Sequence, residues 1–215
     1  MKKTVLTLAL VAASMAAFAQ GKVKVVNDGG SPFTLSSGNV LSADSSVAGQ
    51  AIATSGPLPS GEVLQIGLYW GITSSSLALA IVDPTSPNPG AALLNPAGGG
   101  SGVPGVMNAD QIKITGNAGG SPVFMQVKIW DSAYASYEAE VAAKGTSDYL
   151  GQSAIFQMTP GTGITYPSIL NGGGSTWTAV GNESPIVVSA LVPEPATFAL
   201  AGLGAAALLI FRRRK

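Results

Sequence analysis

Residues 122–130 read PVFMQVKIW, and they carry the clearest strand signal in the chain. Apolar side chains occupy every second position of this stretch: Val123, Met125, Val127 and Ile129. Because successive side chains of a β-strand point to opposite sides, these four share one face. The pattern predicts a strand that turns this face towards a hydrophobic core.

Other short segments on both sides of this stretch show similar strand signals. We expect strands at residues 22–25, 62–70, 77–82, 111–115, 154–157 and 186–189. Gly, Pro, Asn and Ser separate these segments, which is typical of a turn-rich β domain. Residues 84–105 and 171–174 are rich in glycine and proline and are expected to be long surface loops.

One segment, residues 133–144, is expected to be helical. Asp131 or Ser132 precedes it as a candidate cap, and Tyr134, Tyr137 and Val141 fall on one side of it. We expect this helix to pack over an end or edge of the sheets. Together the segments predict a mainly β fold, a β-sandwich or jelly-roll-like single domain with one short helix.

The chain contains no cysteine and no histidine. Disulfides, thiolate metal ligands and cysteine nucleophiles are therefore excluded. The commonest general base and the commonest transition-metal ligand are also missing, and a histidine-based triad is impossible. We expect no catalysis, no cofactor and no metal centre, with calcium bound by loop carboxylates left open.

The zero net charge of the whole chain hides an uneven distribution. The segment 20–195 holds five lysines, no arginine and all eleven acidic residues, which gives it a net charge of −6. Nucleic acid is a poor partner for such a domain, because it lacks the cations that neutralise phosphates. The acidity instead favours solubility outside the cell.

Residues 1–19, MKKTVLTLALVAASMAAFA, are predicted to be a signal peptide. Two lysines precede an apolar run, and Ala17 and Ala19 place small side chains at the positions that signal peptidase reads. Cleavage is expected before Gln20. The alternative, an uncut membrane anchor, is disfavoured because the apolar run is short.

The other end of the chain has three parts in a fixed order. Pro193, Glu194 and Pro195 come first, and an uncharged apolar run of sixteen residues follows at 196–211. The chain then ends on four basic residues: Arg212, Arg213, Arg214 and Lys215. This order predicts a transmembrane helix with a cytoplasmic basic end, although the run is slightly shorter than the ~20 residues that span a bilayer comfortably. The alternative is a plain single-span anchor.

These three parts resemble the PEP-CTERM sorting signal. The same kind of tail is also called an ice-binding protein C-terminal domain, a label that implies no ice binding here. The resemblance implies processing by an exosortase-type membrane protease in a Gram-negative bacterium that makes exopolysaccharide, followed by release or transfer to the outer surface. It divides the chain into a signal peptide (1–19), a secreted β domain (20–191) and a sorting signal (192–215). Residues 126–181 also resemble uncharacterised exported proteins that share this tail, which implies a β-sandwich.

Carboxylates and aromatic rings are the candidate site residues of the β domain. The acids that could form a glycosidase pair are Glu62, Asp83, Asp131, Glu138, Glu140 and Glu183. Glu138 and Glu140 lie two apart on the expected helix and do not share a face, and most of the other acids are expected to be solvated. The rings that could stack on sugars are Tyr69, Trp70, Trp130, Tyr134, Tyr137, Tyr149, Tyr166 and Trp177. Of these, Trp70, Trp130 and Tyr137 are expected to pack in the core or at its edges. Trp177, in a polar stretch, is the best candidate for an exposed ring.

The favoured interpretation is an exported cell-surface or extracellular-matrix protein without catalysis, associated with exopolysaccharide in a biofilm. Its expected partners are signal peptidase, the exosortase-type protease, the inner membrane during sorting, and exopolysaccharide. One alternative is a carbohydrate-binding module with a defined glycan site. Another is a glycan-acting hydrolase that uses paired carboxylates.

Overall fold

The computed structural model describes the central part of the chain in ten segments. They are residues 21–27, 32–53, 57–80, 92–93, 103–106, 110–114, 116–143, 149–162, 166–170 and 186–190. The expected signal peptide (1–19) and the expected membrane span (196–211) lie outside them.

The two longest strands pair at the centre of the molecule. They are β3 (Leu64–Gly71) and β7 (Val123–Asp131), antiparallel, with Leu64 opposite Asp131 and Gly71 opposite Phe124. The four apolar side chains predicted to share a face of β7 are all buried. The prediction of a core-facing strand at 122–130 is therefore confirmed.

Shorter strands line the outer edges of this central pair. Along β7 run β8 (Tyr149–Gln152) and β9 (Phe156–Met158), and along β3 run β4 (Ala78–Leu79) and β5 (Ala92–Leu93). The strand β5 corrects the prediction of a continuous loop over residues 84–105, because Ala92 and Leu93 pair with β3. The strand β8 was not predicted, since Gly151 interrupts its apolar pattern.

The sheet continues from β8 to β10 (Val187–Ala190) and then to β2 (Thr34–Leu35). The pairing of β10 with β2 is parallel, whereas the other pairings of this sheet are antiparallel. The Ala190 amide donates to the Asn39 carbonyl oxygen at 2.8 Å, which ties the end of β10 to the β2 side of the sheet.

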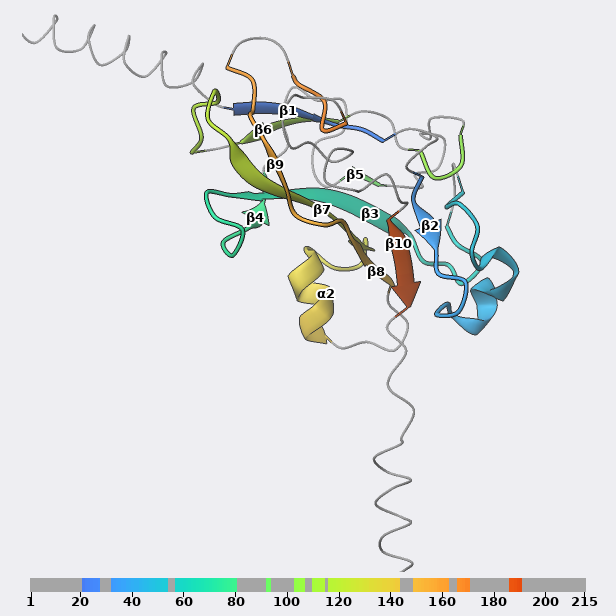
Figure 1. Ribbon diagram of the computed structural model, residues 1–215. Coiled ribbons are helices and arrows are strands. Elements are labelled where there is room, and N and C mark those ends of the chain that lie inside the picture. Colours follow the sequence, from blue (N-terminus) through green and yellow to red (C-terminus); the bar gives the residue numbers. More distant parts are fainter. Residues whose placement is uncertain are drawn as a thin grey trace, which may run out of the picture.

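A second, two-stranded sheet covers the apolar face of the first. It consists of β1 (Gly21–Val25) and β6 (Asp110–Ile114), which pair antiparallel. Its inward side chains join those of β3, β7 and β9 in one core cluster; they are Val23, Val25, Ile112 and Ile114. Figure 1 shows β1 and β6 on one side of the large sheet and the helix α2 on the other.

The helix α2 (Tyr137–Ala143) is shorter than the predicted 133–144. Ser136 caps it, since its Oγ accepts from the Ala139 amide at 3.1 Å; the prediction of Asp131 or Ser132 as cap was wrong. Val141 is 45% exposed, whereas Glu140 is fully buried, so the expected packed side of the helix was also wrong at Val141. The described residues also contain a 3-10 helix, η1 (Ser42–Val47).

The mainly β class with one short α-helix is confirmed for the described residues. The jelly-roll topology is not confirmed, because the described strands form one mixed sheet of eight strands and one sheet of two.

Candidate functional site

The residues predicted for export and sorting lie outside the described part of the chain. This holds for Ala17, Ala19 and Gln20 at the cleavage site, for Pro193, Glu194 and Pro195, and for the basic end Arg212, Arg213, Arg214 and Lys215. It also holds for Trp177, for Asp83 and for Glu183. Their roles stay predictions.

Several of the aromatic rings weighed for sugar stacking are core residues. Trp130, Tyr69 and Tyr149 are buried, and Trp70 is partly buried against the core. Trp130 and Tyr69 meet edge to face, with 6.2 Å between their ring centroids. The expectation that Trp70 and Trp130 pack rather than bind is confirmed.

The side of the large sheet that α2 covers holds a cluster of Tyr69, Lys128, Tyr137 and Glu138. The Lys128 ammonium lies 2.6 Å from Glu138 Oε1, and the Tyr69 hydroxyl donates to Glu138 Oε2 at 2.7 Å. The same ammonium sits 4.2 Å from the Tyr69 ring centroid and 4.8 Å from that of Tyr137. Both oxygens of Glu138 are thus engaged, and the cluster fastens the helix to β3 and β7.

The ionisation of this cluster follows from its contacts. Burial alone would raise the pKa of Glu138, but the hydrogen bonds from Lys128 and Tyr69 outweigh it and lower the pKa below 4.5. Burial, and then the hydrogen bond to Glu138, raise the pKa of Tyr69 far above its ordinary value. Glu138 is therefore a carboxylate and Tyr69 a neutral phenol at neutral pH, which is the pairing that the geometry requires.

Two further acids of the predicted pair set, Asp131 and Glu140, are buried, and for Asp131 this corrects the expectation of a solvated acid. Glu140 Oε2 accepts from the Asp131 amide at 2.7 Å, and Asp131 Oδ1 accepts from the Ala133 amide at 2.7 Å. These carboxylates bind backbone amides of the connection between β7 and α2. Glu138 and Glu140 point to different surroundings, as their spacing predicted.

A third buried acid, Asp44 in η1, was not among the site residues predicted from the sequence. Its carboxylate accepts from the Tyr149 hydroxyl and from the Ser60 amide, each at 2.7 Å. The Tyr149 hydroxyl in turn accepts from the Leu41 amide at 2.9 Å. The network joins the segment around η1 to β8, so Asp44 has a structural role.

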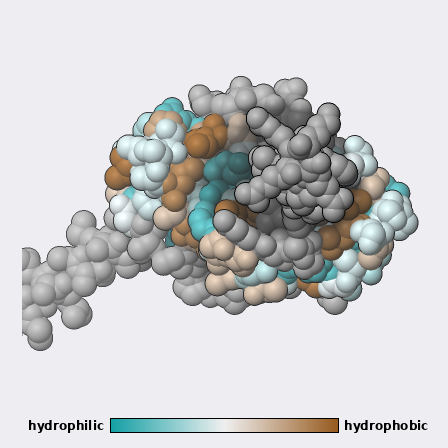
Figure 2. Space-filling model, turned by 90° about the horizontal axis from the view of Figure 1, so that it is seen from below, coloured by the Kyte–Doolittle hydropathy of each residue, from teal (hydrophilic) through white to brown (hydrophobic). Residues whose placement is uncertain are grey.

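An apolar cavity of about 320 Å³ lies beside β2 and η1. Its lining includes Leu35, Val47, Ile52, Leu58 and Pro104, and no titratable side chain lines it. Figure 2 shows one face of the molecule, on which apolar residues lie beside polar ones.

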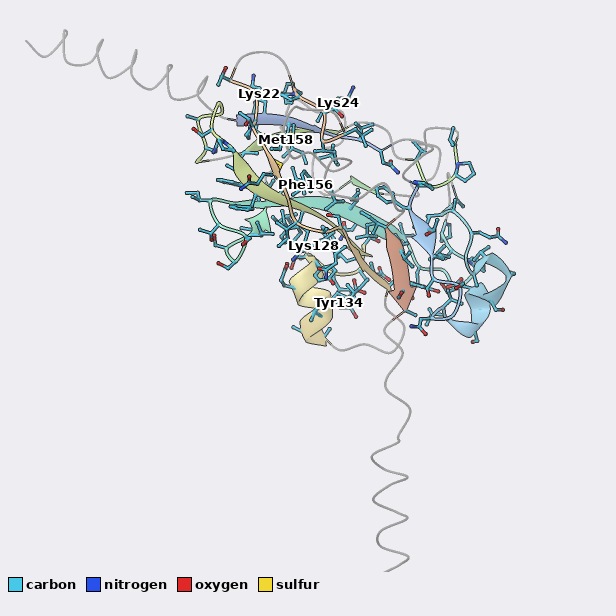
Figure 3. All side chains as sticks on the ribbon, in the orientation of Figure 1. Lys22, Lys24, Lys128, Tyr134, Phe156 and Met158 are labelled. Carbon is cyan, nitrogen blue, oxygen red and sulfur yellow. The ribbon has the colours of Figure 1, made fainter. Side chains whose placement is uncertain are left out.

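The outward side of β1 and β6 carries three lysines. Lys22 of β1 lies directly opposite Lys113 of β6, and Lys24 lies two residues further along β1. All three are partly exposed, and their neighbours Val23, Ile112 and Ile114 point into the core. Figure 3 places Lys22 and Lys24 on the side of the molecule opposite Lys128 and Tyr134. Only knowledge of the strand register could have revealed this face, because β1 and β6 are far apart in the sequence.

Two features are absent from the described residues. Nowhere in them do three or more acidic side chains gather in a way that could hold a metal ion. None of their helices is long and apolar enough to cross a membrane.

Comparison with known proteins gives one finding. No curated protein and no solved structure matches the chain. Residues 191–215 match the model of the PEP-CTERM protein-sorting motif. The chain therefore carries a C-terminal PEP-CTERM sorting domain, the signal of exported proteins that an exosortase-type membrane protease processes.

Proposed function

We propose that this chain is a non-catalytic protein of the cell surface or extracellular matrix, sorted through its tail and associated with exopolysaccharide in a biofilm. The PEP-CTERM motif at residues 191–215 is the observation that carries the proposal. The predicted signal peptide at 1–19 supports it, because a sorting tail is useful only to a chain that enters the export pathway.

The surroundings of the acidic residues support a role without catalysis. A glycoside hydrolase needs two carboxylates that flank a bound sugar. In the described part of the chain, Asp131 and Glu140 bind backbone amides, and Glu138 is engaged by Lys128 and Tyr69. We infer that these acids stabilise the fold.

The sorting proposal is tested by intact mass spectrometry of the protein from cells with and without the exosortase-type protease. We expect a product that lacks residues 1–19 and the C-terminal tail in the first cells, and a longer, membrane-bound form in the second. Replacing Pro193, Glu194 and Pro195 together by alanine should reproduce the longer form in normal cells. Thr197→Ala, in the same tail, is the control and should be processed. An unprocessed product in normal cells would contradict the proposal.

A further inference from the structure

The three lysines on the outward side of β1 and β6 form what we term the lysine face: Lys22, Lys24 and Lys113. The segment 20–195 has only five lysines and a net charge of −6. Three of these five lysines therefore share one side of a two-stranded sheet. In an acidic domain, such a concentration creates a local positive surface.

The three lysines take no part in the core contacts of this sheet. The core contacts of β1 and β6 come from Val23, Val25, Ile112 and Ile114, which point the other way. Like charges directly opposite each other on neighbouring strands are destabilising, as Lys22 and Lys113 are. Neither Lys22 nor Lys24 has an ion-pair partner within the described segments. A bound anion would therefore supply the charge partner that Lys22 and Lys24 lack within the described segments.

An aromatic ring borders the lysine face. The Lys22 ammonium lies 5.4 Å from the centroid of the partly exposed Tyr166 ring. The backbone next to this ring is fixed to β1, since the Lys24 amide donates to Pro167 and the Ile169 amide donates to Lys24. A flat ring held beside ammonium groups can contact a sugar while the ammonium groups contact its carboxylate.

We propose that the lysine face and Tyr166 bind a carboxylated polysaccharide; this inference rests on the proposed association with exopolysaccharide and names its site and chemical class. Residues two apart on a strand are roughly 6.6 Å apart, so the three ammonium groups can contact several carboxylates of one polymer chain. The segment 20–195 has five lysines, no arginine and a net charge of −6, whereas domains that bind nucleic acids are usually strongly basic; this favours a carboxylated glycan over a nucleic acid.

The test measures binding of the purified full chain to polygalacturonate, to neutral dextran of the same length and to single-stranded DNA. We expect binding to polygalacturonate that weakens as salt rises, because exposed charge pairs are screened. Lys24→Gln should weaken it about fivefold, and Lys22→Gln with Lys24→Gln about twentyfold or more. The control, Ser74→Glu with Gln157→Glu, changes the net charge equally at two exposed positions away from the lysine face and should bind like the wild type.

Tyr166 is tested separately, since a ring and a charge leave different signatures. Tyr166→Ala should weaken binding at every salt concentration without changing the salt dependence, and Tyr166→Phe should restore it because stacking needs only the ring. If Tyr166→Ala bound polygalacturonate as the wild type does, the Tyr166 ring would not be part of the site.

Each other outcome overturns a distinct part of the inference. Equal binding by the lysine variants and the wild type would place the glycan elsewhere and leave the proposed function intact. Equal binding of dextran and polygalacturonate would refute the carboxylated class. Tighter binding to single-stranded DNA than to polygalacturonate would indicate that the ligand is a nucleic acid and not a glycan. A wild type that binds none of the three probes would refute the inference, whereas the sorting proposal is judged independently by mass spectrometry.

Discussion

At the scale of single residues, the buried carboxylate of Asp44 is expected to contribute strongly to stability. It is fully buried and accepts two hydrogen bonds, from the Tyr149 hydroxyl and from the Ser60 amide. Losing one partner of a buried polar pair leaves the other desolvated and unsatisfied, which costs more than the bond itself contributed. The two partners of Asp44 come from separate segments, so its loss affects both.

Asp44→Ala is therefore expected to lower the free energy of unfolding by about 2–4 kcal/mol. Tyr149→Phe removes one of the same bonds and should cost about 1–2 kcal/mol. Denaturant unfolding measures both values. Ser45→Ala, at the exposed neighbouring position, is the control and should stay within about 0.5 kcal/mol of the wild type. If Asp44→Ala were as stable as the wild type, the hydrogen bonds of Asp44 with Tyr149 and Ser60 would not be needed for stability.

Glu138 predicts a pH dependence of stability. Its pKa in the folded chain is below the ordinary 4.5, so its contribution is present above pH 4.5 and is lost as pH falls through the lowered pKa. Because the side chain is 54% exposed, we expect less than about 1 kcal/mol. The difference in unfolding free energy between wild type and Glu138→Gln should therefore shrink as the solution is acidified. A difference that does not change with pH would contradict this assignment.

At the scale of elements, the helix α2 shows where sequence patterns mislead. Asp131 and Ser132 look like caps, but Asp131 Oδ1 binds the Ala133 amide in a turn that precedes the helix. Val141 looked like a packing residue, yet the buried position belongs to Glu140, whose carboxylate receives the Asp131 amide. Neither contact can be derived from periodicity, because both depend on where β7 ends relative to the helix.

Ser136→Ala is expected to cost about 1 kcal/mol, because it removes the side-chain acceptor at the start of α2. Ser132→Ala should be nearly neutral, since the interaction that Ser132 makes with Val63 uses its backbone amide. Thermal unfolding followed by circular dichroism compares the two. If Ser132→Ala cost more stability than Ser136→Ala, Ser132 would be the cap, as the sequence predicted.

Gly67 of β3 lies closely packed against Trp130 and Leu79, which leads to a second prediction at this scale. A Cβ added at Gly67 of β3 would lie 2.5 Å from Trp130 Cη2 and 2.6 Å from Leu79 Cδ1. Gly67→Ala should therefore cost about 1–3 kcal/mol. Gly38→Ala meets no atom within 4 Å and is the matched control, expected to be neutral or slightly stabilising. Equal stability of the two variants, measured by denaturant unfolding, would show that Trp130 moves aside without cost.

At the scale of the whole molecule, the sequence predicted the main strands and the mainly β class, because alternation and turn residues are local signals. It missed β2, β5 and β8, which are short and whose pairing depends on strands distant in sequence. The jelly-roll expectation was not confirmed, since the order of strands in a sheet is set by long-range pairing. The lysine face was missed for the same reason, because Lys22 and Lys113 become neighbours only through the register of β1 and β6.

Truncation tests how the C-terminal region contributes to the fold. Deleting residues 196–215 should leave the thermal midpoint of the domain unchanged, because none of the described core residues is removed. Deleting residues 186–215 should abolish cooperative unfolding, since β10 pairs with both β2 and β8 and buries Val188 and Ala190. Circular dichroism of the two shortened chains decides the matter. A cooperative transition in the shorter one would show that β10 is an accessory strand.

The position of β10 has a consequence for the timing of export. Its last residue, Ala190, is hydrogen-bonded to Asn39, and the sorting motif begins at the very next position, 191. In the sequence, only Leu191 and Val192 stand between Ala190 and the Pro-Glu-Pro motif at 193–195. The protease that reads this motif therefore finds its recognition sequence within five residues of β10, and we expect its access to depend on whether this last strand has already joined β2 and β8.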